Sequence, residues 1–210
     1  MHKIKSLGII GGTFNPIHYG HIVAAECARD AFKLDRVVFV PAARPPHKVL
    51  DEVLDSQRRY EMVQMAVQDN PDFAVSALEL KRQGLSYTVE TIASYQQEFP
   101  GAKIFFIIGV DALLLIKNWK DVERLASLCS FIVVTRPGYQ LSHEEENFRE
   151  IPASVWKKIL VVPIPGLYIS SSDIRQRVAK GQTIKYLLPP AIEEYILKND
   201  LYREEETAND

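Results

Sequence analysis

Ser6-Leu-Gly-Ile-Ile-Gly-Gly-Thr-Phe-Asn-Pro-Ile-His-Tyr-Gly-His21 is the stretch of this 210-residue chain that decides its fold. The apolar run from Leu7 to Ile10 predicts a buried strand. The glycine pair after it, Gly11-Gly12, allows a tight turn and a close approach of the backbone to a ligand. After Gly20 the sequence predicts a helix that runs to Phe32.

Two histidines lie at the expected start of this helix. His18 and His21 are three residues apart, where backbone N–H groups and the helix dipole attract anions. A glycine turn alone is equally consistent with a simple chain reversal, and a lone histidine is usually an ordinary surface residue. The two could also bind a metal, but structural zinc needs four ligands at set spacings, and none are nearby. The combination therefore predicts a phosphate site, although the G-x-G-x-x-G and P-loop motifs are both absent.

Strand-like and helix-like segments alternate along the rest of the chain. Strands are predicted at residues 7–10, 36–40, 73–77, 103–109, 131–135 and 160–163. Helices are predicted at residues 21–32, after a cap at Ser56, at 88–99 and 121–128, from Ser171, and from Pro189-Pro190 to about Lys198. Apolar strands separated by helices predict an α/β fold, a Rossmann-like doubly wound parallel sheet with helices on both faces.

The organisation of the chain indicates a single domain. No internal repeat or linker interrupts residues 1–202, and residues 203–210 are expected to form a disordered acidic tail. Hydrophobic residues make up 47% of the chain and charged residues 25%, which is typical of a globular protein. The net charge of −2 gives no broad basic field, so nucleic acid is not an expected partner.

The same sequence predicts a cytoplasmic protein that does not associate with membranes. No signal-peptide pattern precedes the first strand, and no apolar run is long enough to span a membrane. Cys27 and Cys129 each lie in an apolar segment that is expected in the core. Free buried thiols suit a reducing compartment, so no disulfide framework is expected.

Chemistry-bearing residues follow the ends of the predicted strands, where ligands bind in such sheets. Lys48 follows a stiff Pro-Pro pair and suits either a phosphate site or plain surface. Asp111 suits either a ribose contact or a helix cap, and Trp119 either the core or stacking on an aromatic base. Ser171 and Ser172 are typical helix caps, and Arg175 adds a permanent cation one turn later.

Two motifs carry a resemblance to a known family. Gly11-Gly-Thr-Phe-Asn-Pro-Ile-His-Tyr-Gly-His21 resembles the H-x-G-H signature of the nucleotidyltransferase superfamily, and Ile169-Ser-Ser-Ser-Asp-Ile-Arg175 resembles its I-S-S/A-T/S-x-x-R box. Within that superfamily the chain is most similar to bacterial nicotinate-nucleotide adenylyltransferases, from Gly11 to Tyr202. The resemblance implies transfer of the adenylyl group of ATP to nicotinate mononucleotide in NAD biosynthesis. The products would be nicotinate adenine dinucleotide (deamido-NAD) and pyrophosphate.

The resemblance also assigns roles to residues. It implies that His18 and His21 are catalytic and that the ATP-binding residues are Gly11, Gly12, Thr13, Phe14, His18, His21, Gly109, Asp111, Ile169, Ser171, Ser172 and Arg175. The implied nicotinate mononucleotide-binding residues are His47, Lys48, Tyr87, Thr88, Trp119 and Arg136. Ala42-Ala43 stands where the family commonly has an asparagine, so a side-chain contact from there is not expected. Mg²⁺ is expected to arrive with ATP rather than in a metal site built by the protein.

Three other interpretations stay open at this point. Phosphopantetheine adenylyltransferases share both motifs, although they are usually shorter and lack the tryptophan and the S-Y-T and R-P-G segments. A relative that prefers the nicotinamide nucleotide would run the same reaction on an amide. A nucleotide-binding regulator would keep the pocket without turnover. The oligomeric state is also open, and a homo-oligomer is one of its alternatives.

Overall fold

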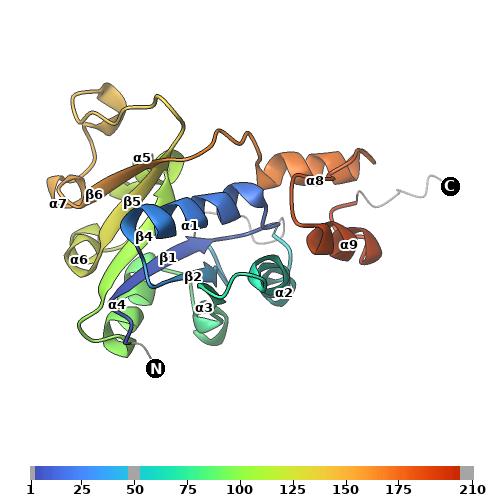
Figure 1. Ribbon diagram of the computed structural model, residues 1–210, viewed down its shortest axis with the longest axis horizontal. Coiled ribbons are helices and arrows are strands. Elements are labelled where there is room, and N and C mark those ends of the chain that lie inside the picture. The colour runs from blue at the N-terminus through green and yellow to red at the C-terminus, as the bar shows by residue number, and fades with distance from the viewer. Residues whose placement is uncertain (1–2, 47–52, 204–210) are drawn as a thin grey trace.

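Six parallel strands form the centre of the computed structural model, which describes residues 3–46 and 53–203. Their spatial order is β3-β2-β1-β4-β5-β6, which confirms the predicted doubly wound sheet (Figure 1). The prediction for His47 and Lys48, and most of the predicted tail, lie outside the described residues. The strands are β1 (Ser6–Gly12), β2 (Arg36–Pro41), β3 (Phe73–Val75), β4 (Lys103–Gly109), β5 (Ser130–Thr135) and β6 (Ile159–Pro163).

The inner strands β1, β2, β4 and β5 are buried on both faces because their side chains alternate between two hydrophobic clusters, whereas the edge strand β6 is partly exposed. In β1, Ile10 belongs to one cluster, whereas Leu7 and Ile9 belong to the other. In β4, Ile107 lies in the first cluster and Phe106 in the second. Continuous apolar runs are therefore the correct signal for these strands, since a strand with one solvated face would alternate with polar residues.

Helices cover each cluster on its outer side. Buried side chains of α1, α2, α8 and α9 belong to the first cluster, and those of α4, α5, α6 and α7 to the second. Figure 1 shows α1 lying across the sheet, with α8 and α9 at the end of the molecule near the C-terminus. The helices are α1 (Tyr19–Phe32), α2 (Ser56–Val67), α3 (Leu78–Lys81), α4 (Thr88–Glu98), α5 (Val110–Leu114), α6 (Val122–Leu128), α7 (Ala153–Trp156), α8 (Ser171–Ala179) and α9 (Pro190–Lys198), and the 3₁₀ turns are η2 (Ile116–Asn118) and η3 (Glu146–Phe148).

The prediction that Ser56 caps α2 is wrong by one residue. Asp55 is the cap, because its Oδ1 accepts hydrogen bonds from the backbone N–H of Gln57 at 2.8 Å and of Arg58 at 3.3 Å. At α8 the cap is Ser170, whose Oγ accepts from the backbone N–H of Asp173 at 3.1 Å. The side chains of Ser171 and Ser172 are therefore left for other contacts.

The C-terminal part of the chain returns to the N-terminal loop. The Tyr202 hydroxyl donates to Oδ1 of Asn15 at 2.8 Å, and the Tyr195 hydroxyl donates to Oε2 of Glu61 at 2.8 Å.

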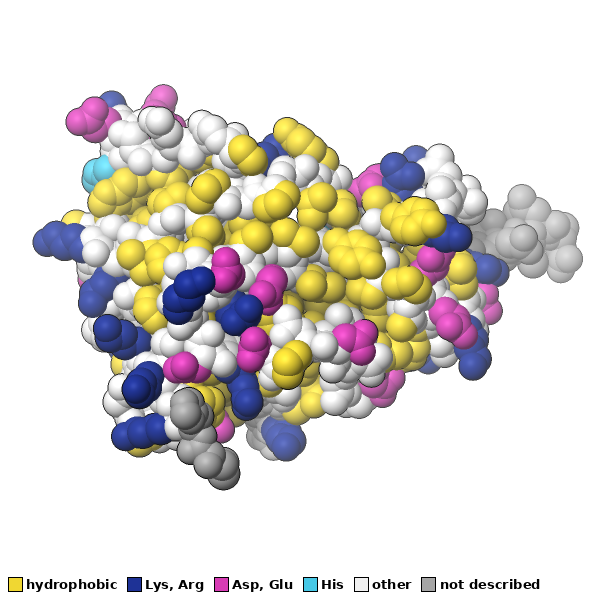
Figure 2. Space-filling model, in the orientation of Figure 1, with side chains coloured by type: hydrophobic (Ala, Val, Ile, Leu, Met, Phe, Trp, Pro, Cys, Tyr) yellow, Lys and Arg dark blue, Asp and Glu magenta, His cyan; other side chains and the backbone are white. Residues whose placement is uncertain are grey.

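Acidic and basic side chains are interspersed over the face in Figure 2. In the described part of the chain, no helix combines the length and the apolar character that a membrane crossing needs.

Candidate active site

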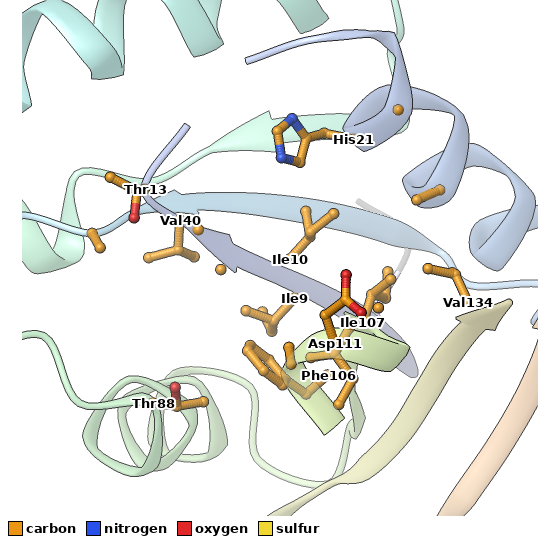
Figure 3. A pocket seen from close by; sticks show the side chains of 18 of the residues that line it. Ile9, Ile10, Thr13, His21, Val40, Thr88, Phe106, Ile107, Asp111 and Val134 are labelled. Atoms are coloured by element: carbon orange, nitrogen blue, oxygen red, sulfur yellow. The ribbon is translucent and has the colours of Figure 1, made fainter. Parts of the chain in front are cut away.

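A cleft of about 610 Å³ opens at the carboxyl ends of β1 and β4, the two neighbours from which the strand order runs outward in opposite directions. Ligands bind at this switch point in doubly wound sheets. Figure 3 shows the His21 ring projecting from α1 toward the cleft, with Asp111 and Thr88 on other sides of it. The predicted site residues that line the cleft are Gly11, Gly12, Thr13, His18, His21, Thr88, Gly109, Asp111, Trp119, Ile169 and Ser171.

A second, smaller hollow of about 240 Å³ adjoins the cleft, since Thr13, His21 and Ser171 line both. Phe14, Ser172 and Arg175 line this hollow as well. Of the predicted site residues that the structure describes, two line neither space. The Tyr87 ring lies under the Lys120 ammonium group, 4.0 Å from Nζ, and the guanidinium of Arg136 lies 4.1 Å from the centre of the exposed Tyr168 ring.

The two histidine rings stack at the N-terminus of α1. Their centroids are 3.8 Å apart with an interplanar angle of 28°, and His18 is buried. The backbone N–H of His18 donates to Nδ1 of His21 at 3.3 Å. Because Nδ1 accepts this bond, the neutral ring of His21 carries its proton on Nε2. His21 therefore has a hydrogen-bond donor on its other ring nitrogen.

Both imidazoles are neutral at neutral pH. Burial lowers the pKa of His18 to about 4. Burial also lowers the pKa of His21 well below its ordinary value, and the neighbouring His18 lowers it further. The pair can thus donate hydrogen bonds to a phosphate without the cost of burying two charges.

The lowered pKa values make the stability of the ligand-free protein dependent on pH. Between pH 6.5 and about 4 the unfolded chain binds a proton at position 18 that the folded protein excludes, so the free energy of unfolding falls as the pH falls. We expect His18 to account for about 3 kcal/mol of this loss. Urea unfolding at several pH values should show a shallower acid decline for His18→Asn than for the wild type. An exposed control, His143→Gln, should keep the full slope, and an unchanged slope in His18→Asn would contradict the assignment.

Two neighbours hold the histidine pair in place. A Cβ on Gly20 would lie 2.9 Å from Cε1 and Nδ1 of the His18 ring, so this position of the H-x-G-H motif has room only for glycine. Phe14 is buried and packs its ring edge-on against His21, with the centroids 5.0 Å apart. Its side chain therefore supports His21 from the core.

Arg175 lies where α8 meets the loop after β1. Its Nη1 donates to the backbone carbonyl of Asn15 at 2.8 Å, and Ser171 Oγ donates to the carbonyl of Pro16 at 2.8 Å. The sequence predicted these two motifs as one site, and the hydrogen bonds connect them across more than 150 residues of chain. A guanidinium beside a helix N-terminus can bind the oxygens of a polyphosphate.

The far side of the cleft is made by the starts of α4 and α5. Gly109 is the N-cap of α5 and Asp111 is the second residue of the helix, so the alternative that Asp111 is the helix cap is wrong. Trp119 packs edge-on against Phe106, 5.8 Å between centroids, and also lines the cleft. Thr88 is the first residue of α4, where backbone N–H groups have no partner within the helix.

The sequence analysis missed several residues that line the cleft. Glu79 is buried there and accepts a hydrogen bond from Thr91 Oγ1 at 2.5 Å. Glu79 lies on α3, which has only four residues and so gives no periodic signal. Ser86 also lines the cleft, and its hydroxyl accepts from the backbone N–H of Ala43 at 3.0 Å and of Arg44 at 3.2 Å.

Comparison with known proteins agrees with this geometry. The Cytidylyltransferase-like family model matches residues 9–177. The chain is 50% identical over 198 residues to a Moorella thermoacetica protein, covering 94% of this chain and 91% of that one. It is 46% identical over 207 residues to a Thermoanaerobacter protein, covering 98% of each. Both relatives carry the name "Probable nicotinate-nucleotide adenylyltransferase".

Solved structures show the same fold. A nicotinic acid mononucleotide adenylyltransferase from Plasmodium falciparum, complexed with NaAD, superimposes with a TM-score of 0.76 at 21% identity. The match covers 94% of this chain and 97% of that one. From the family model and from the full-length relatives near 50% identity, the chain belongs to the cytidylyltransferase-like family and, within it, to the nicotinate-nucleotide adenylyltransferases.

Proposed function

We propose that this enzyme transfers the adenylyl group of ATP to nicotinate mononucleotide, forming nicotinate adenine dinucleotide and releasing pyrophosphate. The observation that carries the proposal is the convergence of His18, His21 and the start of α8 on one cleft at the switch point of the sheet. Full-length relatives bear the corresponding name. The intact histidine pair favours turnover over a regulator that only binds nucleotide.

The reaction needs charge stabilisation more than proton transfer. A 5′-phosphate oxygen of the acceptor attacks the α-phosphorus of ATP, and the bond to the bridging oxygen of pyrophosphate breaks in line with it. The attacking phosphate is already an anion near neutral pH, so no general base is required. Neutral imidazoles suit this task, because they can donate hydrogen bonds to the transferring phosphoryl group. Their lowered pKa values keep them from taking up a proton near neutral pH.

The ATP side of the site is proposed along β1, α5 and α8. Gly11 and Gly12 are the last two residues of β1, where the lack of side chains gives a nucleotide close access to the backbone, and Asp111 suits the ribose hydroxyls. Arg175 and the N-terminus of α8 would hold the β- and γ-phosphates in the smaller hollow. Among the described residues, no group of three or more His, Cys, Asp or Glu side chains is placed to hold a metal ion. In this proposal Mg²⁺ enters with ATP, as part of the MgATP substrate.

The acceptor side is proposed across the cleft, between Thr88 and Trp119. The indole can stack on a pyridine ring, and the start of α4 offers N–H donors to a carboxylate. Tyr87 and Arg136 would need to move to reach an acceptor, since both hold cation–π contacts outside the cleft. A cytoplasmic location stays a prediction from the sequence, and the oligomeric state stays open.

Pyrophosphate release separates this function from its rivals. With MgATP, we expect rapid release with nicotinate mononucleotide and release at background level with 4′-phosphopantetheine. Coupling the product to pyrophosphatase and measuring phosphate gives both rates in one assay. Fast turnover with the pantetheine substrate would assign the protein to the other adenylyltransferase class. Binding of ATP with no pyrophosphate from either acceptor would favour the regulator.

A further inference from the structure

Arg59 is a buried cation that the reaction as described does not use. Its side chain lies on α2, is only 1% exposed and belongs to the largest fully buried side chains of the protein. Within the described residues, no carboxylate lies within ion-pair distance of it. A guanidinium in such a place needs strong hydrogen bonds to offset the cost of desolvation.

The partners of Arg59 are backbone carbonyls from three separate segments. Nη1 donates to Thr13 at 2.6 Å, Nη2 to Ala42 at 2.7 Å and Nε to Leu54 at 2.7 Å. A second bond from Nη2 reaches the carbonyl of Ala43 at 3.4 Å. The planar fork of one guanidinium therefore holds the loop after β1 and the loop after β2 in a fixed relation.

The contacts with Thr13 and Ala42 each lead to one side of the cleft. Thr13 precedes Phe14, which has a positive φ of 48° and packs its ring against His21. A non-glycine residue in this left-handed region is strained, so the loop needs support from outside. The hydrogen bond to the Thr13 carbonyl supplies that support next to the strained residue. On this side Arg59 acts on the position of His21.

The other contact leads to the acceptor side. The backbone N–H of Ala42 donates to the Gly12 carbonyl at 2.9 Å, which ties the two loops directly. The next two N–H groups, of Ala43 and Arg44, donate to the Ser86 hydroxyl at 3.0 and 3.2 Å. Ser86 lies two residues before Thr88, at the start of α4. A chain of hydrogen bonds thus connects Arg59 to the proposed acceptor pocket.

We propose that Arg59 is a positioning residue. It fixes the loop after β1, at Thr13, relative to the loop after β2, at Ala42. One part of this inference, the assignment of the loop at Ala42 to the acceptor, rests on the proposed function. It predicts that disturbing one buried side chain weakens the binding of both substrates, although Arg59 itself lines neither the cleft nor the smaller hollow.

The test compares Arg59→Lys with Arg58→Lys, the same change at the exposed neighbouring position on α2. A lysine ammonium is a point charge and cannot span three carbonyls. For Arg59→Lys we expect kcat/KM to fall about 10²-fold for both substrates, with a raised KM for each and a lower kcat per folded molecule. Arg58→Lys should match the wild type. If Arg59→Lys does not fold, Arg59→Gln replaces it, and the folded fraction of each variant is measured by circular dichroism.

Two further measurements need no turnover, so they stay informative if the proposed acceptor is wrong. Calorimetry with a non-hydrolysable ATP analogue should give weaker binding in Arg59→Lys. Hydrogen exchange should be faster at the amides of Ala42, Ala43 and Arg44 and unchanged in β5. A general loss of stability, with unchanged KM values for both substrates and normal kcat per folded molecule, would overturn the proposal. Absence of activity in the wild type would instead overturn the proposed function.

Discussion

Replacing His21 by alanine is expected to lower kcat about 10²-fold or more, while KM for ATP changes much less. The reason is that a donor aimed at the transferring phosphoryl group is worth most when charge develops in the transition state. The His18 backbone N–H occupies Nδ1 of His21, so the donor in this argument is Nε2. Steady-state kinetics with MgATP varied at saturating nicotinate mononucleotide gives both parameters.

Two amide variants test which nitrogen acts. The side-chain nitrogen of glutamine in His21→Gln lies near the place of Nε2, whereas that of asparagine in His21→Asn lies nearer to Nδ1. We therefore expect His21→Gln to keep more activity than His21→Asn. His143→Gln, a change at an exposed histidine outside the cleft, should leave kcat unchanged. Near-normal turnover in His21→Ala would leave His21 as a structural residue.

The fold was predictable because its local signals do not depend on tertiary contacts. Each strand is an apolar run bounded by turn residues, and the predicted runs fall on all six strands of the sheet. The error at the start of α2 came because two neighbouring residues compete for one role. Asp55 and Ser56 can both cap a helix, and the choice depends on which backbone N–H groups the side chain reaches. The spacing of residues does not contain that information.

Residues of the candidate site were predictable only where they belong to a short, continuous sequence motif. The H-x-G-H segment places its own two histidines, because they are one helical turn apart at a helix start. Arg59 could not be placed in this way, since its partners lie 46 and 17 residues away in the chain. One signal was available: Arg59 precedes Met62 and Val63 by three and four positions, so it lies on the buried face of a helix. A charged residue in that position indicates a buried polar network.

The start of α4 is expected to make the enzyme faster with nicotinate mononucleotide than with its nicotinamide counterpart. A carboxylate presents two acceptor oxygens, whereas an amide presents one oxygen and an NH₂ that would face backbone donors. One unpaired buried polar group costs a few kcal/mol, so we expect kcat/KM to differ by about 10²-fold. Rates with the two acceptors at fixed MgATP measure this ratio. Equal values, or a preference for the amide, would contradict the deamido assignment and leave adenylyl transfer intact.

The helix geometry allows the responsible donor to be removed by itself. Thr88 is the first residue of α4, a position where proline is tolerated, and Tyr87 before it has the extended conformation that a following proline requires. Thr88→Pro therefore removes the N–H and the hydroxyl without breaking the helix, and Thr88→Ala removes the hydroxyl alone. We expect Thr88→Ala to keep the preference for the carboxylate and Thr88→Pro to lose most of it, through a higher KM for nicotinate mononucleotide. If both variants discriminate as the wild type does, the carboxylate is recognised elsewhere in the cleft.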